Sequence, residues 1–118
     1  MDPMATKAET AALPTHDPVL DDITRRLVAA MHPERIYLFG SRARGENGAD
    51  QDYDLLVVVA SSDLPGYRRD QEAFQALAGI PASKDVIVLT REEFDRRRGI
   101  VCSLPATVER EGRLIHGG

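Results

Sequence analysis

The sequence predicts an α/β fold in which a small mixed β-sheet is flanked by helices. Helical and extended patterns alternate along the chain, in the order helix, strand, helix, strand, helix, strand, helix. The far end of one extended segment, Leu55 to Ala60, is apolar on both faces, which is typical of a strand in the middle of a sheet. A chain of 118 residues fits one such domain, without a separate domain for binding a substrate.

The first predicted helix begins at an N-cap. Asp17 is a favourable capping residue, and Pro18 suits the first position of a helix. Apolar residues then follow at helical spacing, which predicts an amphipathic helix to about Met31 whose core side is Leu20, Ile23, Leu27 and Met31. Residues 1 to 16 show no periodicity, so we expect a flexible N-terminal tail ahead of a domain that covers residues 17 to 118.

A turn is predicted between the first two strands. Arg35 to Phe39 has the pattern of a buried strand. Gly40 permits a tight turn, and Ser41 can cap a short helix that ends near Gly45. After a polar loop, a second strand is expected from Asp52 to Val59.

The second half of the chain predicts helices around two further strands. A helix is expected over Tyr67 to Ala78, with a core side made of Phe74, Leu77 and Ala78. The remaining expected elements are a strand over Asp85 to Leu89, a helix that Thr90 and Glu93 begin as a capping box, a helix near Leu104 to Glu111, and a strand over Arg113 to Ile115.

Composition and charge exclude several classes of protein. Hydrophobic residues make up 42% and charged residues 29% of the chain, as in ordinary globular proteins. A net charge of −4 argues against binding nucleic acid over a broad surface. The longest apolar run is too short to cross a membrane, and the first residues carry charges where a secretory signal would be apolar. We therefore expect a cytoplasmic protein with no membrane or direct nucleic-acid partner.

Several residues outside these patterns are expected to have structural roles or none. Cys102 is alone in the chain, so it is expected to be a buried small hydrophobic residue rather than part of a disulfide or zinc site. Tyr37 and Tyr53 are expected to pack in the core, and no role is assigned to the three histidines, His16, His32 and His116. Three basic runs, Arg25-Arg26, Arg68-Arg69 and Arg96-Arg97-Arg98, are either solvated faces or contacts for an acidic partner.

A pair of aspartates is the strongest candidate for a metal site. Asp52 and Asp54 lie two apart on one predicted strand, so their carboxylates project from the same face and can share an ion. Mg²⁺ prefers oxygen ligands and is commonly held by one or two carboxylates together with substrate phosphates. Taken by themselves, the two residues could equally be surface aspartates at the end of a strand.

The segment before the pair has the pattern of a phosphate-binding turn. Gly40 and Ser41 end a strand and open a short helix, where unpaired backbone N–H groups form an anion site. The Ser41 hydroxyl can add a donor, and Arg42 or Arg44 can add positive charge. Capping alone would also explain the serine, but a phosphate site beside an acidic pair predicts a metal–nucleotide site.

A third carboxylate begins the next apolar strand. If the two strands are neighbours, Asp85 lies alongside Asp52 and Asp54, where it suits a third metal ligand or a general base. The alternative is a residue at the start of a strand that pairs with the adjacent Lys84.

The stretch from Gly40 to Leu56, GSRARGENGADQDYDLL, resembles the signature of the DNA polymerase β superfamily, a Gly-Ser turn followed by Asp-x-Asp. Together with Asp85 and the closing Glu-Gly-x-Leu-Ile segment, it resembles the minimal nucleotidyltransferase (MNT) family over about residues 18 to 117. The resemblance implies the nucleotidyltransferase fold, related to the polymerase β palm. It further implies a Gly40-Ser41 turn that binds triphosphate and three aspartates, Asp52, Asp54 and Asp85, that hold two Mg²⁺ ions, with Mn²⁺ as a substitute. Gln51 departs from the serine that the family often has before the first metal-binding aspartate.

Stand-alone members of this size resemble the antitoxin of HEPN/MNT toxin–antitoxin pairs. The resemblance implies transfer of AMP from ATP to a tyrosine hydroxyl of a HEPN-domain ribonuclease toxin, with which the chain would form a complex. Two other functions remain open: an antitoxin that acts by binding alone, and a nucleotidyltransferase that modifies a small molecule such as an antibiotic. The intact Asp-x-Asp argues against the first, and the absence of an additional helical domain argues against the second.

Overall fold

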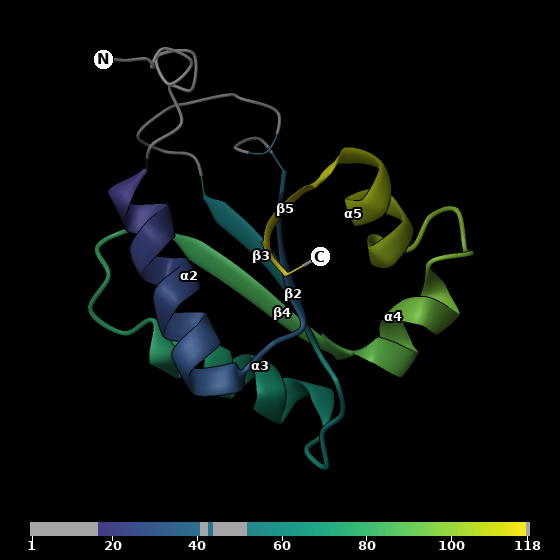
Figure 1. Ribbon diagram of the computed structural model, residues 1–118, viewed down its shortest axis with the longest axis horizontal. Helices are drawn as coiled ribbons and strands as arrows, with labels where there is room; N and C mark the ends of the chain where they lie inside the picture. Colours follow the sequence, from purple (N-terminus) through teal and green to yellow (C-terminus); the bar gives the residue numbers. More distant parts are fainter. Residues whose placement is uncertain (1–16, 41–42, 44–51, 118) are drawn as a thin grey trace, which may run out of the picture.

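A computed structural model describes residues 17–40, 43 and 52–117 of the chain (Figure 1). Within these residues the strands form a sheet of four with the order β4-β3-β2-β5. The strands are β2 (Arg35–Phe39), β3 (Tyr53–Val59), β4 (Lys84–Thr90) and β5 (Arg113–Gly117). β2 is antiparallel to both β3 and β5, whereas β4 is parallel to β3, so the predicted mixed sheet is confirmed.

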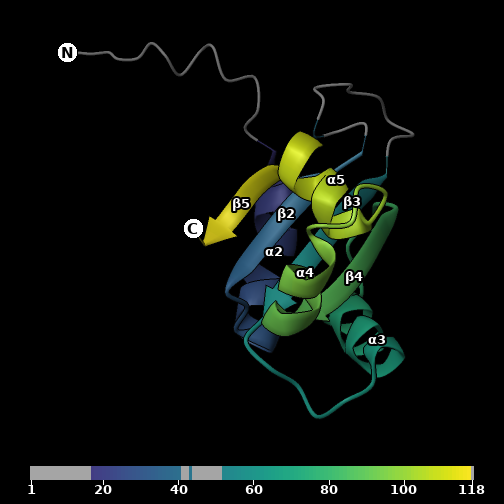
Figure 2. The same cartoon turned by 90° about the vertical axis from the view of Figure 1, so that its right-hand side faces the viewer.

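Helices cover both faces of the sheet, as the sequence predicts. The helices are α2 (Pro18–Met31), α3 (Gly66–Ala76), α4 (Arg91–Arg97) and α5 (Leu104–Glu111). Figure 2 shows α4 and α5 in front of the sheet and α2 behind it. The expected tail at residues 1 to 16 and the expected short helix after Gly40 lie outside the described residues, apart from Ala43.

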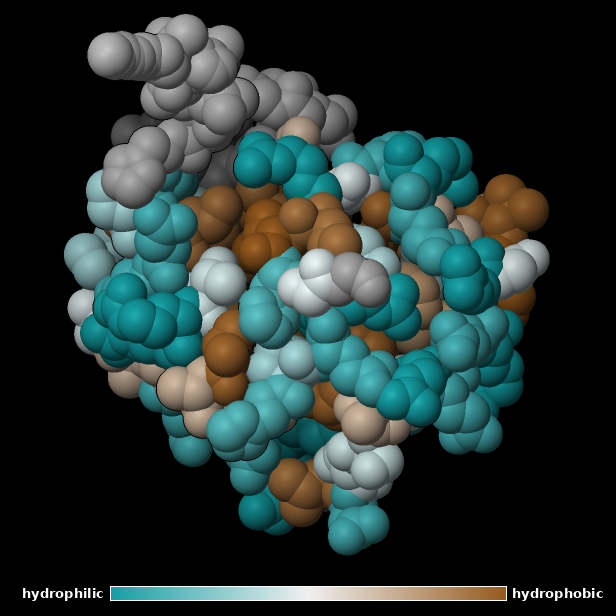
Figure 3. Space-filling model, in the orientation of Figure 1, coloured by the Kyte–Doolittle hydropathy of each residue, from teal (hydrophilic) through white to brown (hydrophobic). Residues whose placement is uncertain are grey.

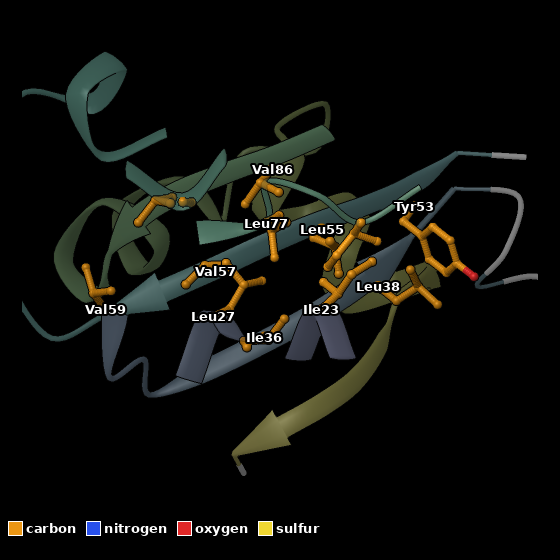
Figure 4. Close-up of a cluster of buried hydrophobic side chains, with 13 residues drawn as sticks. Ile23, Leu27, Ile36, Leu38, Tyr53, Leu55, Val57, Val59, Leu77 and Val86 are labelled. Atoms are coloured by element: carbon orange, nitrogen blue, oxygen red, sulfur yellow. The ribbon is translucent and has the colours of Figure 1, made fainter. Parts of the chain in front are cut away.

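β3 provides the centre of the core because both of its faces are buried. Its odd-numbered side chains pack with Ile23 and Leu27 of α2 and with Leu77, in the cluster drawn in Figure 4. Its even-numbered side chains Leu56 and Val58 pack with residues of α4 and α5 in a second cluster. The run that is apolar on both faces is therefore an inner strand, as predicted.

Local signals at helix ends are also confirmed. The Asp17 carboxylate accepts hydrogen bonds from the backbone N–H groups of Val19 and Leu20, at 3.0 and 3.1 Å, and so caps α2. Thr90 and Glu93 form the predicted capping box at the start of α4. At both helix starts, backbone N–H groups are therefore hydrogen-bonded by residues that are close in the sequence.

The predicted core side of α3 is wrong at two positions. Ala73 and Leu77 are fully buried, but Phe74 is 55% exposed and Ala78 is exposed as well. The helix ends at Ala76, so Ala78 lies in the turn that follows. The Phe74 ring faces Lys84, whose ammonium nitrogen lies 5.6 Å from the ring centroid.

Cys102 is exposed, contrary to the prediction that it is buried. It lies in the turn between α4 and α5, after two other exposed apolar residues, Ile100 and Val101. The prediction used the average burial of cysteine, but no element of the described structure covers this turn.

The three basic runs have different surroundings. Arg69 is only 5% exposed and pairs with Glu93, so it is not available to an acidic partner. The other arginines of these three runs that form ion pairs do so with nearby acidic side chains at the surface: Arg25 and Arg26 with Asp22, Arg96 with Glu92, and Arg98 with Asp95 and Glu109.

The surface in the orientation of Figure 1 is mainly hydrophilic. Figure 3 shows a hydrophobic patch where β5 runs between α2 and α5. Leu114 of β5 is 45% exposed and lines a hollow with Leu20 and Thr24 of α2. The helices in the described part of the chain are too short or too polar to span a lipid bilayer.

Candidate active site

The candidate site lies where β2 ends and where β3 and β4 begin. In the sheet register, Phe39 is opposite Asp54, and Asp54 is opposite Asp85. Gly40 follows Phe39 directly, so it lies beside Asp54 as well. The strands are thus neighbours as the prediction for Asp85 required, and residues far apart in the sequence come together at one end of the sheet.

The carboxylates of Asp54 and Asp85 lie on the face of the sheet that α4 and α5 cover. Side chains of a strand alternate between its faces, so Asp54 shares a face with Leu56, which packs in the cluster of α4 and α5. Asp85 shares that face with Leu89 for the same reason. The parallel register sets both carboxylates side by side at the start of their strands.

Gly40 gives the Asp54 carboxylate the space that it occupies. Its φ is +78°, in the region that side chains other than glycine rarely adopt. A Cβ atom at this position would collide with a carboxylate oxygen of Asp54. Glycine therefore serves both the turn and the close approach of the carboxylate, and the sequence signal revealed only the turn.

The surroundings of Asp54 disfavour its charged form. The pKa of Asp54 is raised, first because burial removes water from its carboxylate, and then because the charges of Asp85 and Asp52 lie nearby. Asp52 and Asp85 themselves are exposed. A bound cation would stabilise the negatively charged Asp54 carboxylate, which this environment disfavours.

The described residues provide part of a metal site. No three His, Cys, Asp or Glu side chains within residues 17–40 and 52–117 converge closely enough to enclose an ion by themselves. The chemistry of the donors nevertheless fits Mg²⁺, because hard carboxylate oxygens lie next to a turn and because Mg²⁺ takes its other ligands from water and phosphate. Ser41, Arg42 and Arg44, the other predicted ligand-binding residues, lie outside the described residues.

The alternative of an Asp85–Lys84 ion pair is wrong. Lys84 donates to the backbone carbonyl oxygens of Ile80 and Ala82, at 3.1 and 3.0 Å. Lys84 and Asp85 are consecutive in β4, so their side chains project to opposite faces. Lys84 therefore does not neutralise the Asp85 carboxylate.

Tyr53 connects the site to the capped end of α2. Its side chain is buried, as predicted, with only 4% of the residue exposed, and its hydroxyl donates to the Asp17 carboxylate at 2.7 Å. The other oxygen of that carboxylate caps α2. One residue thus holds both the helix and the backbone between Asp52 and Asp54. This contact was not predicted from the sequence, although a buried tyrosine hydroxyl requires a partner.

Comparison with known proteins identifies similar sequences and folds. The family model described as the nucleotidyltransferase domain matches residues 20–115. A search of curated proteins finds no match.

Three solved structures have a similar fold. A toxin–antitoxin structure with AMP-PNP is 22% identical, with a TM-score of 0.52, over 83% of this chain and 73% of that one. A mutant of the MntA-HpeT toxin–antitoxin is 21% identical, with a TM-score of 0.59, over 84% and 72% of the two chains. A second MntA-HpeT mutant, in which two aspartates two positions apart are replaced by glutamate, is 18% identical, with a TM-score of 0.58, over 83% and 72%.

Proposed function

This chain belongs to the nucleotidyltransferase domain family, and we propose that it is an antitoxin that transfers AMP from ATP to a tyrosine of its toxin. The observation that carries the proposal is the register of the sheet, which sets Asp54 opposite Asp85 beside Gly40. The Asp54 and Asp85 carboxylates lie at the starts of two neighbouring strands, next to the glycine turn. Carboxylates in this arrangement are suited to bind a triphosphate through divalent metal ions. The proposed location is the cytoplasm, where ATP is present.

The proposed metal ligands are Asp52, Asp54 and Asp85. Bound Mg²⁺ or Mn²⁺, two ions in the proposal, would offset the charge of the triphosphate and polarise its α-phosphate. The raised pKa of Asp54 supports this assignment, because its cause is burial together with the two neighbouring carboxylates. The proposed phosphate ligands are Gly40, Ser41, Arg42 and Arg44, on the strength of the sequence pattern.

In the proposed reaction, the oxygen of the acceptor tyrosine forms a bond to the α-phosphorus of ATP. The bond between the α-phosphorus and the oxygen that bridges to the β-phosphate breaks, and pyrophosphate leaves with its electron pair. Asp85 accepts the proton of the tyrosine hydroxyl, because its exposed carboxylate lies beside Asp54. Asp52 and Asp54 keep the reacting groups aligned.

The acceptor is proposed to be a HEPN-domain ribonuclease toxin that forms a complex with this chain. The similar folds support a toxin partner, since all three come from toxin–antitoxin structures, one of them with AMP-PNP. The paired aspartates that were exchanged in one of those proteins have the same spacing as Asp52 and Asp54. Inhibition by binding alone and modification of a small molecule are the alternatives that the experiment must separate.

The test is to incubate the chain with ATP, Mg²⁺ and the HEPN-domain toxin encoded next to it, and to measure the intact mass of the toxin. We expect the mass to increase by one or more AMP units and the ribonuclease activity to fall in parallel. Asp54→Asn is expected to lower the transfer rate by at least about 100-fold, since it removes charge from the metal site. Asp63→Asn, a matched change in an exposed loop, is expected to leave the rate unchanged.

Two outcomes would contradict the proposal. If the toxin loses its activity without a gain in mass, and equally well with Asp54→Asn, inhibition is by binding alone. If a small molecule rather than the toxin gains AMP, the acceptor assignment is wrong while the transferase assignment stands.

A further inference from the structure

The outer edge of β4 is hydrogen-bonded to α3 at Val88, whereas no described residue hydrogen-bonds to this edge at Val86, a residue that is 5% exposed. β4 is at the end of the sheet order, so only one of its edges pairs with a strand. At Val88 the other edge is occupied by side chains of α3: the Val88 N–H donates to Asp70 at 2.8 Å, and the Val88 carbonyl accepts from Arg69 at 3.2 Å. Because every second residue of a strand directs its backbone groups to the same edge, the N–H and C=O of Val86 face this outer edge too.

A groove of about 430 Å³ runs along the edge at Val86. One wall is the outward side of α3, and the other is the first part of β4. The lining residues are Tyr67, Asp70, Gln71 and Phe74 of α3, with Asp85, Val86 and Ile87 of β4. Tyr67 and Phe74 are 71% and 55% exposed, so two aromatic rings in the groove have large free surfaces. Exposed aromatic residues beside an unpaired strand edge are suited to bind an extended chain.

The groove and the candidate active site share Asp85, whose carboxylate lies on the face of the sheet opposite α3. Asp85 lines the groove and is also the register partner of Asp54. The opposite edge of the sheet lacks this connection, because β2 separates β5 from β3. A peptide segment bound along β4 therefore has a residue beside Asp85 and Asp54, whereas a segment bound along β5 does not.

We propose that this groove binds the acceptor segment of the protein substrate, which adds to the edge of β4 as an extended strand and brings its tyrosine to Asp85. The proposal rests on the proposed function for the identity of the substrate. The charged residues that line the groove, Asp70 and Asp85, are both acidic. We therefore expect Lys or Arg beside the acceptor tyrosine. The Lys84 ammonium is held by two carbonyl oxygens and lies 5.6 Å from the Phe74 ring centroid, but Lys84 does not itself line the groove.

Binding is tested without transfer by placing every variant in the Asp54→Asn protein and titrating it with the full-length toxin. We expect Phe74→Ser and Gln71→Lys to weaken the affinity for the toxin by about tenfold or more, since one removes an aromatic contact and the other opposes a basic segment. Both residues are exposed, and melting curves verify that the variants are folded. The matched controls are Gln75→Lys, an exposed position of α3 outside the groove, and Leu114→Ser on the opposite sheet edge, each expected to stay within about twofold.

Hydrogen exchange gives a direct measurement of strand addition. Toxin binding is expected to slow exchange of the Val86 amide, because that N–H would then donate to the added strand. Unchanged exchange at Val86 would overturn the proposal. Three results of the titration would also overturn it: the groove variants and the controls bind the toxin equally well, Leu114→Ser alone weakens binding, or the toxin does not bind. A homodimer that Gln71→Lys dissociates would assign the edge to a second copy, which also overturns it.

The two proposals fail in different ways. If the toxin binds through the groove but gains no mass in the active protein, the proposed transfer is wrong and the docking surface stands. If the toxin gains mass and Phe74→Ser and Gln71→Lys leave its KM unchanged, the docking surface is wrong and the transfer stands.

Discussion

The folded chain disfavours a negative charge on Asp54. Burial, Asp85 and Asp52 together raise the pKa of its carboxyl. Nothing in the packing of β3 requires an acid there, since the strand continues with apolar residues that are fully buried. The charge is therefore best explained by a ligand that the folded state binds, at some cost to the stability of the free protein.

Replacing Asp54 by Asn should stabilise the protein when metal is absent. A raised pKa in the folded state means that stability falls as pH rises from the ordinary value of 3.8 through the raised value. We expect the melting temperature of Asp54→Asn to exceed that of the wild type by about 2 to 4 °C near neutral pH, and the difference to vanish below about pH 3.

Metal should reverse this order. Excess Mg²⁺ with AMP-PNP is expected to raise the melting temperature of the wild type and to have little effect on Asp54→Asn, because a ligand of the folded state stabilises it by mass action. Asp63→Asn is the control and should behave like the wild type under both conditions. An Asp54→Asn protein that melts lower than the wild type without metal would show that the carboxylate has a structural role.

Glu93 joins three elements at one point. Its carboxylate accepts two hydrogen bonds from Arg69 of α3, at 2.8 and 3.1 Å, and one from the Thr90 N–H at the start of α4, at 2.9 Å. Arg69 also donates to the carbonyl of Val88 in β4. The hydrogen bonds from Arg69, followed by that from Thr90, lower the pKa of Glu93 to about 2 despite its partial burial. Glu93 of the capping box thus also neutralises the buried guanidinium of Arg69.

Glu93→Gln should destabilise the protein in a pH-dependent way. Because the folded pKa is depressed, the contribution is present above the ordinary value of 4.5 and is lost as pH falls towards about 2. We expect a loss of roughly 1 to 3 kcal/mol near neutral pH, by urea unfolding, and a smaller loss below about pH 3. Glu92→Gln is the control, since the Glu92 side chain is 84% exposed, and should change stability little. A loss that is equal at both pH values would assign the effect to packing rather than charge.

At the scale of the whole molecule, one strand supports both halves of the core. Leu55 of β3 belongs to the cluster under α2, and the next residue, Leu56, belongs to the cluster under α4 and α5. Neither cluster can lose β3 and remain packed. The two layers should therefore unfold together, as in most small domains.

Leu55→Ala and Leu56→Ala test this coupling. Both side chains are fully buried, so each substitution should cost about 2 to 5 kcal/mol. We expect each to lower one shared unfolding transition, followed by tyrosine fluorescence in variants whose single remaining tyrosine is Tyr53 of one cluster or Tyr37 of the other. Leu114→Ala, at a half-exposed position, should cost much less. Two separate transitions in either core variant would show that the layers are independent.

The sequence by itself determined the features that depend on near neighbours along the chain. The cap of α2 by Asp17, the capping box of Thr90 and the turn at Gly40 each use residues within a few positions of one another. Alternation along a strand likewise predicts that Asp52 and Asp54 project from one face. The α/β class and the family could be predicted for this reason, since local patterns carry the order of elements and the signature.

Only the tertiary structure decided what lies opposite each residue. The pairing of β3 with β4 sets Asp54 against Asp85, and the position of α3 leaves Phe74 at the surface while it buries Arg69. Cys102 is exposed because no described element covers its turn. Periodicity identifies the residues that share a face of a helix or strand, but burial depends on which distant segment packs against that face, and that contact is made only when the chain folds.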